Sequence, residues 1–178
     1  MKKDILYAIT CLTFSIMVGG AVYEHLCVVP SWSAAPPLSL SMFQGEYGLK
    51  AETFWMLIHP VNLLLFSASL AMCWRTQRKK SLIIVLAGYI SILIITAIYF
   101  VPELLTIVQT PFSTEVDPDL TRRAKLWEVL SIIRMFVLFA LTIVLYLGLT
   151  RAGTRVPSFQ KRNEGKQRSA KQVMQLEA

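Results

Sequence analysis

Four long apolar runs constrain this chain more than any other feature of its sequence. They cover approximately residues 5–29, 52–74, 81–108 and 124–150 of a 178-residue chain. A helix needs about 20 mainly apolar residues to cross the hydrocarbon core of a bilayer, and each run exceeds that length. None of the runs alternates polar and apolar residues as the strands of a membrane barrel do. The sequence therefore predicts an all-α fold, a four-helix up-and-down transmembrane bundle within residues 1–150.

The composition supports the same class of protein. Hydrophobic residues make up 54% of the chain and charged residues 16%, whereas soluble domains average about 45–50% and about 25%. These values exclude a disordered chain and a disulfide scaffold. The three cysteines include no Cys-x-x-Cys pair, which disfavours thiol–disulfide exchange and favours small buried apolar side chains.

The positive charges predict the orientation of the bundle. Thirteen of the 18 Lys and Arg residues fall near the N-terminus, in the turn 75–80 and in the tail 151–178. Four fall on the other side, and Arg134 lies inside the fourth run. Basic loops stay in the cytoplasm, so both termini should be cytoplasmic in a multi-pass protein of the cell inner (plasma) membrane. The net charge of +7 is then a signal of topology, and we expect no nucleic-acid partner.

Two further segments lead to specific expectations. The apolar core of the first run, Ile5 to Val22, has 18 residues, against about 7–15 in a cleaved signal peptide, so we expect it to be retained as a span. The loop 30–51 has an apolar middle, Leu38 to Leu49, which should lie against the mouth of the bundle as a lid. The tail 151–178 is polar and basic, and we interpret it as a cytoplasmic determinant of topology.

Ionisable residues interrupt all four runs toward the side away from the basic turn. Such residues are costly in hydrocarbon and usually face the interior of a bundle or a cavity. At about 100° per residue, several polar side chains share one face of each helix. The spacing therefore predicts one polar site in the outer half of the bundle, formed by Glu24, Glu52, His59, Asn62, Thr96, Tyr99, Glu103, Trp127, Glu128, Ser131 and Arg134.

The residue types suggest roles within this site. Glu24, His59 and Glu103 are the candidate ligands or acid–base groups. Arg134 is a candidate charge partner for Glu103 or Glu24, or an anchor for an oxyanion. The substrate pocket would be shaped by four further residues: Tyr99, Asn62, Trp127 and Ser131.

Three interpretations of this site remain open. A carboxylate–histidine metal site, with Glu24, His59, Glu103 and Glu128 as ligands, would suit iron, copper or zinc, although the chain has no Glu-x-x-His pair. Metal-free acid–base chemistry on a lipophilic substrate is the second. A purely structural polar network is the third. Haem ligation by His25 and His59 is disfavoured because the two lie at different depths, and four spans are few for a proton-coupled carrier.

Short motifs in the first and fourth runs resemble a known family. Glycines precede a glutamate late in the first run, from Gly19 to Glu24, and a proline-bearing outer loop follows. Trp127 and Arg134 lie on one face of the fourth run. In these features residues 5–150 resemble the small four-span proteins related to anthrone oxygenases, many of which carry histidine where this chain has Arg134.

The resemblance implies oxidation of an aromatic polyketide or a related lipophilic molecule at the membrane. We therefore expect a small integral membrane oxidoreductase, an oxygenase-like protein that is either metal-dependent or cofactor-free. The alternative is a non-catalytic membrane subunit, or a lipophilic-ligand-binding protein whose polar cluster is structural. The expected partners are the lipid bilayer, a lipophilic small molecule and a homo-oligomer or larger membrane complex.

Overall fold

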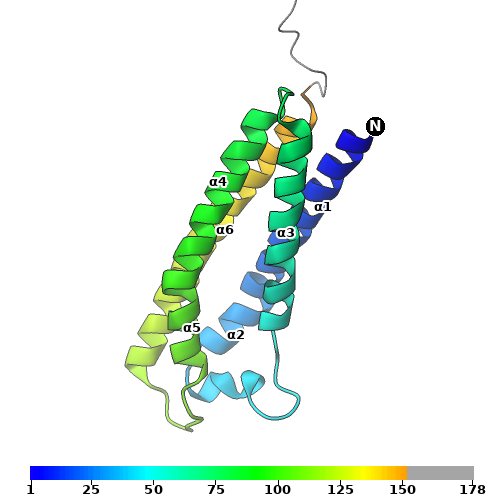
Figure 1. The fold of residues 1–178 in the computed structure, drawn as a ribbon. Helices are drawn as coiled ribbons and strands as arrows, with labels where there is room; N and C mark the ends of the chain where they lie inside the picture. The colour runs from blue at the N-terminus through cyan, green and yellow to red at the C-terminus, as the bar shows by residue number, and fades with distance from the viewer. Residues whose placement is uncertain (152–178) are drawn as a thin grey trace, which may run out of the picture.

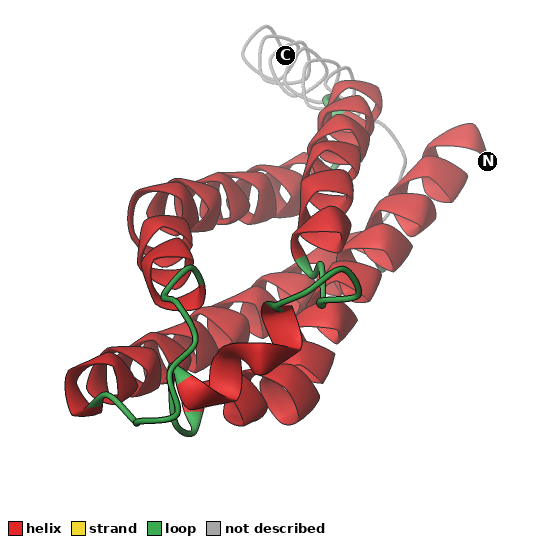
Figure 2. Cartoon of the chain, turned by 90° about the horizontal axis from the view of Figure 1, so that it is seen from below, coloured by secondary structure: helices red, strands yellow, loops and turns green. Residues whose placement is uncertain are grey.

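The computed structural model describes residues 1–151, and in this part of the chain it confirms the all-α fold. Four helices are long and apolar enough to cross a membrane, and residues 1–151 contain no β-strand (Figures 1 and 2). Successive helices run in alternating directions. The predicted tail, 151–178, lies outside the described residues except for Arg151.

Two of the four spans are built from several helical segments. In chain order the elements are α1 (Lys2–Tyr23), the π-helix η1 (Glu24–Val28), α2 (Val29–Ser33), the 3-10 helix η2 (Leu38–Phe43), α3 (Glu52–Cys73), α4 (Lys79–Ile95), the π-helix η3 (Thr96–Phe100), α5 (Val101–Val108) and α6 (Pro118–Leu149). The first span runs through α1, η1 and α2, and the third runs through α4, η3 and α5.

Local chemistry explains where the spans differ from the predicted boundaries. The fourth span begins at Pro118 rather than near residue 124 because Asp117 caps the helix. Its carboxylate accepts hydrogen bonds from the backbone N–H groups of Asp119 and Leu120. Proline favours the first turn of a helix, where its missing N–H costs nothing. The first span likewise continues to Ser33, because Pro30 lies in the first turn of α2.

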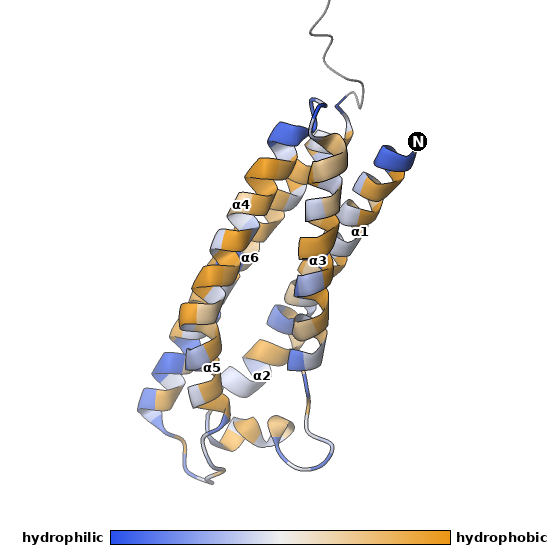
Figure 3. Cartoon of the chain, viewed as in Figure 1, coloured by the Kyte–Doolittle hydropathy of each residue, from blue (hydrophilic) through white to orange (hydrophobic). Residues whose placement is uncertain are grey.

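The helices enclose a narrow core and leave large apolar side chains on the outside. α1 packs against α3 and α6, and α4 packs against the same two helices. Many large hydrophobic side chains face outward, among them Leu64, Ile98 and Phe136, which are 71%, 75% and 64% exposed. Apolar residues predominate along the spans and hydrophilic residues cluster at their ends (Figure 3). A helix that is apolar on all sides suits a lipid environment, so the fold is that of a multi-pass membrane protein.

We call the two ends of the bundle the basic end and the loop end. The basic end carries the N-terminus and the turn between α3 and α4, and the loop end carries η2 and the connection between α5 and α6. At the loop end, Leu40 of η2 is fully buried and Phe43 packs edge-on against Trp32. The loop 30–51 therefore lies against the mouth of the bundle, as its apolar middle predicts.

At the basic end, a buried arginine joins three parts of the fold. Arg78 is 7% exposed and its Nη1 lies 2.7 Å from Oδ1 of Asp4 in α1. It also donates to the carbonyl oxygens of Leu149 and Arg151 at the end of α6. The last carbonyls of a helix lack intrahelical partners, so Arg78 satisfies one of these acceptors, that of Leu149, and one just beyond the helix while holding α1 against α6.

Candidate functional site

A polar layer separates two hydrophobic clusters in the bundle. The cluster toward the basic end includes Phe14, Phe66 and Leu138, whereas the cluster toward the loop end includes Trp32, Phe100 and Trp127. In the first, third and fourth spans, polar side chains lie between the residues of one cluster and those of the other. The second span adds polar side chains of its own. We define the polar layer as Glu24, Trp55, His59, Asn62, Tyr89, Thr96, Ser131 and Arg134.

One side of the polar layer is a connected series of side chains from three spans. Trp55 Nε1 donates to Glu24 Oε1 at 2.8 Å. The Trp55 ring stacks on His59, with ring centroids 5.5 Å apart and planes at 25°. His59 Nδ1 lies 2.7 Å from the Tyr89 hydroxyl. These contacts fix the imidazole on both sides, and His59 Nε2 has no hydrogen-bond partner among residues 1–151.

The other side of the polar layer is formed by Arg134. Its Nη1 donates to Thr96 Oγ1 at 3.0 Å, and its Nη2 donates to Ser131 Oγ at 2.8 Å. The guanidinium carbon lies 4.2 Å from the centre of the Phe100 ring. Arg134 pairs with no carboxylate of residues 1–151.

Asn62 is a fully buried polar residue of the layer. It lies one turn of α3 from His59 and is 0% exposed. Neither its amide nitrogen nor its amide oxygen has a hydrogen-bond partner among residues 1–151. Buried amides are normally paired, and an unpaired buried polar group costs about 1–3 kcal/mol. Asn62 therefore adds a free donor and a free acceptor beside His59.

Both π-helical segments occur next to the polar layer. Glu24 is the first residue of η1, and Thr96 is the first residue of η3. Each segment is followed by a proline, Pro30 or Pro102, whose missing N–H interrupts the regular hydrogen-bond ladder. Single π-turns within helices are frequent at functional sites. Here each π-turn rotates the side chains that follow Glu24 or Thr96 away from the face that they would occupy in a regular α-helix.

The expected pairing of Arg134 with Glu103 is wrong. Glu103 instead accepts two hydrogen bonds from Arg123, at 2.7 Å from Nε and 2.9 Å from Nη2. A bidentate arginine–carboxylate pair is a strong and specific geometry. It joins α5 to the start of α6, at the loop end, and it removes Glu103 from the polar layer.

Glu128 also lies outside the polar layer. Its Oε2 accepts from Lys125 Nζ at 2.9 Å and from Ser33 Oγ at 2.8 Å. These bonds hold the end of the first span against α6. The carboxylate is thus engaged in a contact between helices rather than directed toward Arg134.

Of the four residues expected to shape a pocket, two belong to the polar layer and two do not. Ser131 and Asn62 lie in the layer. Trp127 donates from Nε1 to the carbonyl oxygen of Phe100 at 2.9 Å and is buried in the loop-end cluster. Tyr99 packs on that cluster, with its ring 5.2 Å from that of Phe100. The carbonyl of Phe100 is the last of η3, so Trp127 stabilises this π-segment.

The expected metal ligands are not gathered in one place. Among residues 1–151, no group of three or more His, Cys, Asp and Glu side chains could hold a metal ion. The four candidates have different partners, which are Trp55 for Glu24, Tyr89 for His59, Arg123 for Glu103, and Lys125 with Ser33 for Glu128. The geometry of these donors does not fit a site for iron, copper or zinc.

Tyr89 was absent from the residues predicted for this site. It lies seven residues before Thr96, a separation that returns to the same face of a helix after two turns. The periodicity could therefore have identified it. Arg123 was likewise not among the predicted site residues, because it precedes the fourth apolar run, which begins at Ala124.

The fold and the polar layer define a class of protein, a four-span α-helical membrane protein with an arginine–histidine–carboxylate layer inside the bundle. No protein-family model, curated protein or solved structure matches this chain.

Proposed function

We propose that this protein is an oxygenase-like oxidoreductase of the inner (plasma) membrane, which binds a lipophilic, acidic small molecule in the polar layer. In this proposal both termini are cytoplasmic and the layer opens toward the outer leaflet. The ligand presents an oxyanion or an acidic hydroxyl group to Arg134. Its apolar body lies among the side chains of the bundle.

The environment of Arg134 is the observation that supports this proposal most directly. An arginine has five N–H donors, and among residues 1–151 this one has two neutral hydroxyls and an aromatic face as its polar and cation–π partners. A cation at membrane depth is costly and normally has an anionic partner or a polar cavity. An anionic ligand would supply the missing charge. The unpaired amide of Asn62 would supply a second hydrogen bond.

His59 is the candidate base for the oxidation. If Nδ1 donates to Tyr89, the lone pair on Nε2 is available to take a proton from an acidic C–H group of the ligand. For an anthrone, the resulting carbanion transfers its electrons to dioxygen and forms a hydroperoxide on that carbon. Loss of water from the hydroperoxide leaves a carbonyl, so one anthrone and one O₂ give one quinone and one H₂O. Arg134 would stabilise the oxyanion formed when the proton leaves.

The test uses the purified full-length protein in phosphatidylcholine nanodiscs with a dihydroxyanthrone as probe. Oxygen consumption and the absorbance of the quinone are followed against protein-free nanodiscs, which report spontaneous oxidation. We expect wild type to accelerate quinone formation, His59→Gln to lose the acceleration, and Arg134→Met to lose binding of the probe. Arg122→Met is the matched control, because Arg122 lies on the same helix and is 80% exposed.

Metal dependence and turnover separate this proposal from its competitors. Treatment with a chelator should leave the rate unchanged, because no three His, Cys, Asp or Glu side chains of residues 1–151 lie together to hold a metal ion. A rate abolished by chelation and restored by iron, copper or zinc would contradict the metal-free scheme. Quinone formation at the rate of protein-free nanodiscs would contradict the enzymatic proposal as a whole.

A non-catalytic function is the second candidate, and the carboxylate pairs favour it. Glu103 with Arg123, and Glu128 with Lys125, are ordinary contacts between neighbouring helices. In this case the protein binds a lipophilic molecule, or serves as a subunit of a homo-oligomer or a larger membrane complex. Binding of the probe that depends on Arg134, without any turnover, would support this alternative.

A further inference from the structure

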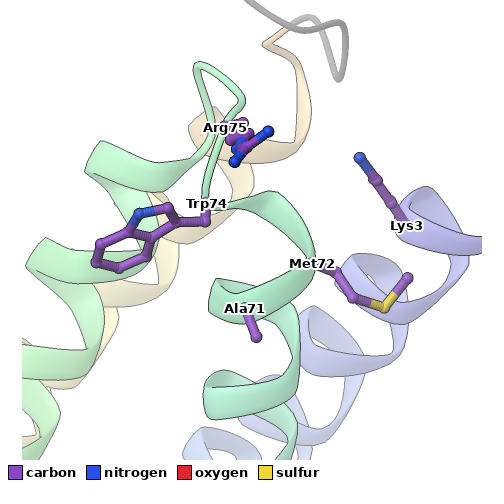
Figure 4. A pocket seen from close by; sticks show the side chains of 5 residues that line it. All are labelled: Lys3, Ala71, Met72, Trp74 and Arg75. Carbon is purple, nitrogen blue, oxygen red and sulfur yellow. The ribbon is translucent and has the colours of Figure 1, made fainter.

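The basic end of the bundle has an open hollow between α1 and the end of α3. Its volume is about 550 Å³, and it lies at the opposite end of the bundle from the loop-end contacts of Glu103 and Glu128. Residues of both helices and of the following turn line it (Figure 4): Lys3, Ala71, Met72, Trp74 and Arg75. The hollow is thus separate from the polar layer.

The hollow carries two cations that nothing in the described chain neutralises. Lys3 extends from α1 and Arg75 from the turn after α3, on either side of the opening (Figure 4). Neither forms an ion pair with a carboxylate of residues 1–151. Asp4, which follows Lys3, is bonded to the N-terminal amine at 2.8 Å and to Arg78 at 2.7 Å. The opening is therefore positively charged.

The remaining walls of the hollow suit a lipid. Ala71 and Met72 are apolar and exposed on the side of α3 that continues into the span. Trp74 is 53% exposed, and Lys79 Nζ lies 3.6 Å from the centre of its ring. Tryptophan with neighbouring basic residues is typical of the boundary between hydrocarbon and lipid headgroups. The cations therefore lie at headgroup level and the apolar wall lies below them.

We propose that this hollow binds one acidic phospholipid. The phosphate lies between Lys3 and Arg75, and an acyl chain follows Ala71 and Met72 toward the middle of the membrane. Basic pockets between spans on the cytoplasmic side bind acidic headgroups. A soluble phosphate would use the same cations but would gain nothing from the apolar wall, so the lipid fits the lining better. This site is independent of the function proposed for the polar layer.

The test measures retained lipid on the full-length protein. Nanodiscs contain equal parts of phosphatidylcholine and phosphatidylglycerol, and native mass spectrometry counts the lipids that stay bound to wild type and variants. Any single basic residue near a membrane surface contributes about fivefold, so Lys3→Gln and Arg75→Gln should each reduce retention of phosphatidylglycerol by more than this. Lys2→Gln and Lys80→Gln are matched controls, because both are exposed basic residues of the same end that do not line the hollow.

A second variant separates the shape of the hollow from its charge. Ala71→Phe keeps both cations and fills the apolar wall, and Ala71 is exposed, so the bundle should still fold. We expect this variant to lose phosphatidylglycerol as the charge variants do. The proposal would be overturned if the lining and control variants lost equal amounts of phosphatidylglycerol. It would also be overturned if wild type retained phosphatidylcholine as well as phosphatidylglycerol, or if inorganic phosphate alone displaced the bound phosphatidylglycerol.

Discussion

His59 Nδ1 lies 2.7 Å from the hydroxyl oxygen of Tyr89, and this bond links α3 to α4 within the polar layer. Tyr89 is fully buried, with its ring among Phe14 and Phe66. The phenol therefore has a fixed position, and the imidazole is held between it and the stacked ring of Trp55. The same bond directs His59 Nε2 away from Tyr89, so the packing of the apolar core determines which nitrogen is available for chemistry.

Tyr89→Phe tests this link. Loss of the hydroxyl leaves His59 Nδ1 without its partner, and we expect the free energy of unfolding to fall by about 1–3 kcal/mol. The measurement is thermal unfolding in detergent of wild type, Tyr89→Phe, His59→Leu and the double variant. If the two side chains act through one bond, the double variant should be much less destabilised than the sum of the single variants. Additive losses would contradict the link.

The pair formed by Glu103 and Arg123 gives a second prediction. Both side chains are partly exposed, at 22% and 39%, so we expect a coupling of about 1 kcal/mol in a cycle of Glu103→Gln and Arg123→Met. Arg134→Met and Glu103→Gln should instead be additive, because the two residues are not bonded. A measurable coupling energy between Arg134 and Glu103 would contradict the pairing of Glu103 with Arg123.

The number and kind of spans could be predicted from the sequence because they depend on local composition. A run of apolar residues such as 81–108 is long enough to cross the bilayer whatever it packs against. The face shared by Trp55, His59 and Asn62 could be predicted for the same reason, since it follows from helical periodicity alone. These expectations needed no knowledge of neighbouring helices.

The partners of the charged residues could not be predicted in this way. Periodicity places Glu103 and Arg134 on inward faces but does not give their relative heights. The π-turn at Thr96–Phe100 changes the phase of the helix before Glu103, and the cap at Asp117 extends α6 far enough to bring Arg123 beside it. The π-turn changes the face on which Glu103 lies, and the earlier start of α6 brings residues 118–123 into the helix, which suffices to exchange one arginine for another.

Arg78 is the strongest single link at the basic end, and its removal should destabilise the fold. Arg78→Met would break the contacts with Asp4, Leu149 and Arg151 and leave the two carbonyl oxygens without this donor, whereas Asp4 would keep its bond to the N-terminal amine. We expect a clearly lower melting temperature, because unpaired buried acceptors destabilise a fold. Arg78→Lys should rescue little, since one ammonium group cannot reproduce the planar fork. Lys80→Met is the control, and equal melting temperatures for Arg78→Met and Lys80→Met would refute this role.

Gly148 permits a close approach of three spans near the basic end. A Cβ at this position would collide with the Tyr7 hydroxyl and would lie 2.7 Å from Ser81 Cβ. The Tyr7 hydroxyl donates to the carbonyl of Leu145 at 2.9 Å, so it cannot move without losing that bond. We expect Gly148→Ala to lower the free energy of unfolding by about 1–3 kcal/mol, the usual cost of overpacking.

Gly19→Ala is the matched control for that substitution. No atom lies within 4 Å of a Cβ built at Gly19, and alanine favours a helix over glycine by about 1 kcal/mol. This variant should therefore be as stable as wild type or more so. The melting temperatures of the two variants are compared by thermal unfolding. Equal melting temperatures for Gly148→Ala and Gly19→Ala would contradict the close approach at Gly148.

The orientation of the bundle can be tested by labelling single cysteines in intact cells. Ser41 at the loop end and Gln77 at the basic end are both exposed, whereas neighbouring Thr76 is only 6% exposed and would be protected in either orientation. The native Cys27 is exposed and should first be replaced by serine, while Cys11 and Cys73 are buried. Because basic loops remain in the cytoplasm, an impermeant maleimide should label Ser41→Cys in intact cells and Gln77→Cys only after the membrane is opened. The reverse pattern would place the loop end in the cytoplasm, and the polar layer would then face ligands from the cytoplasmic leaflet.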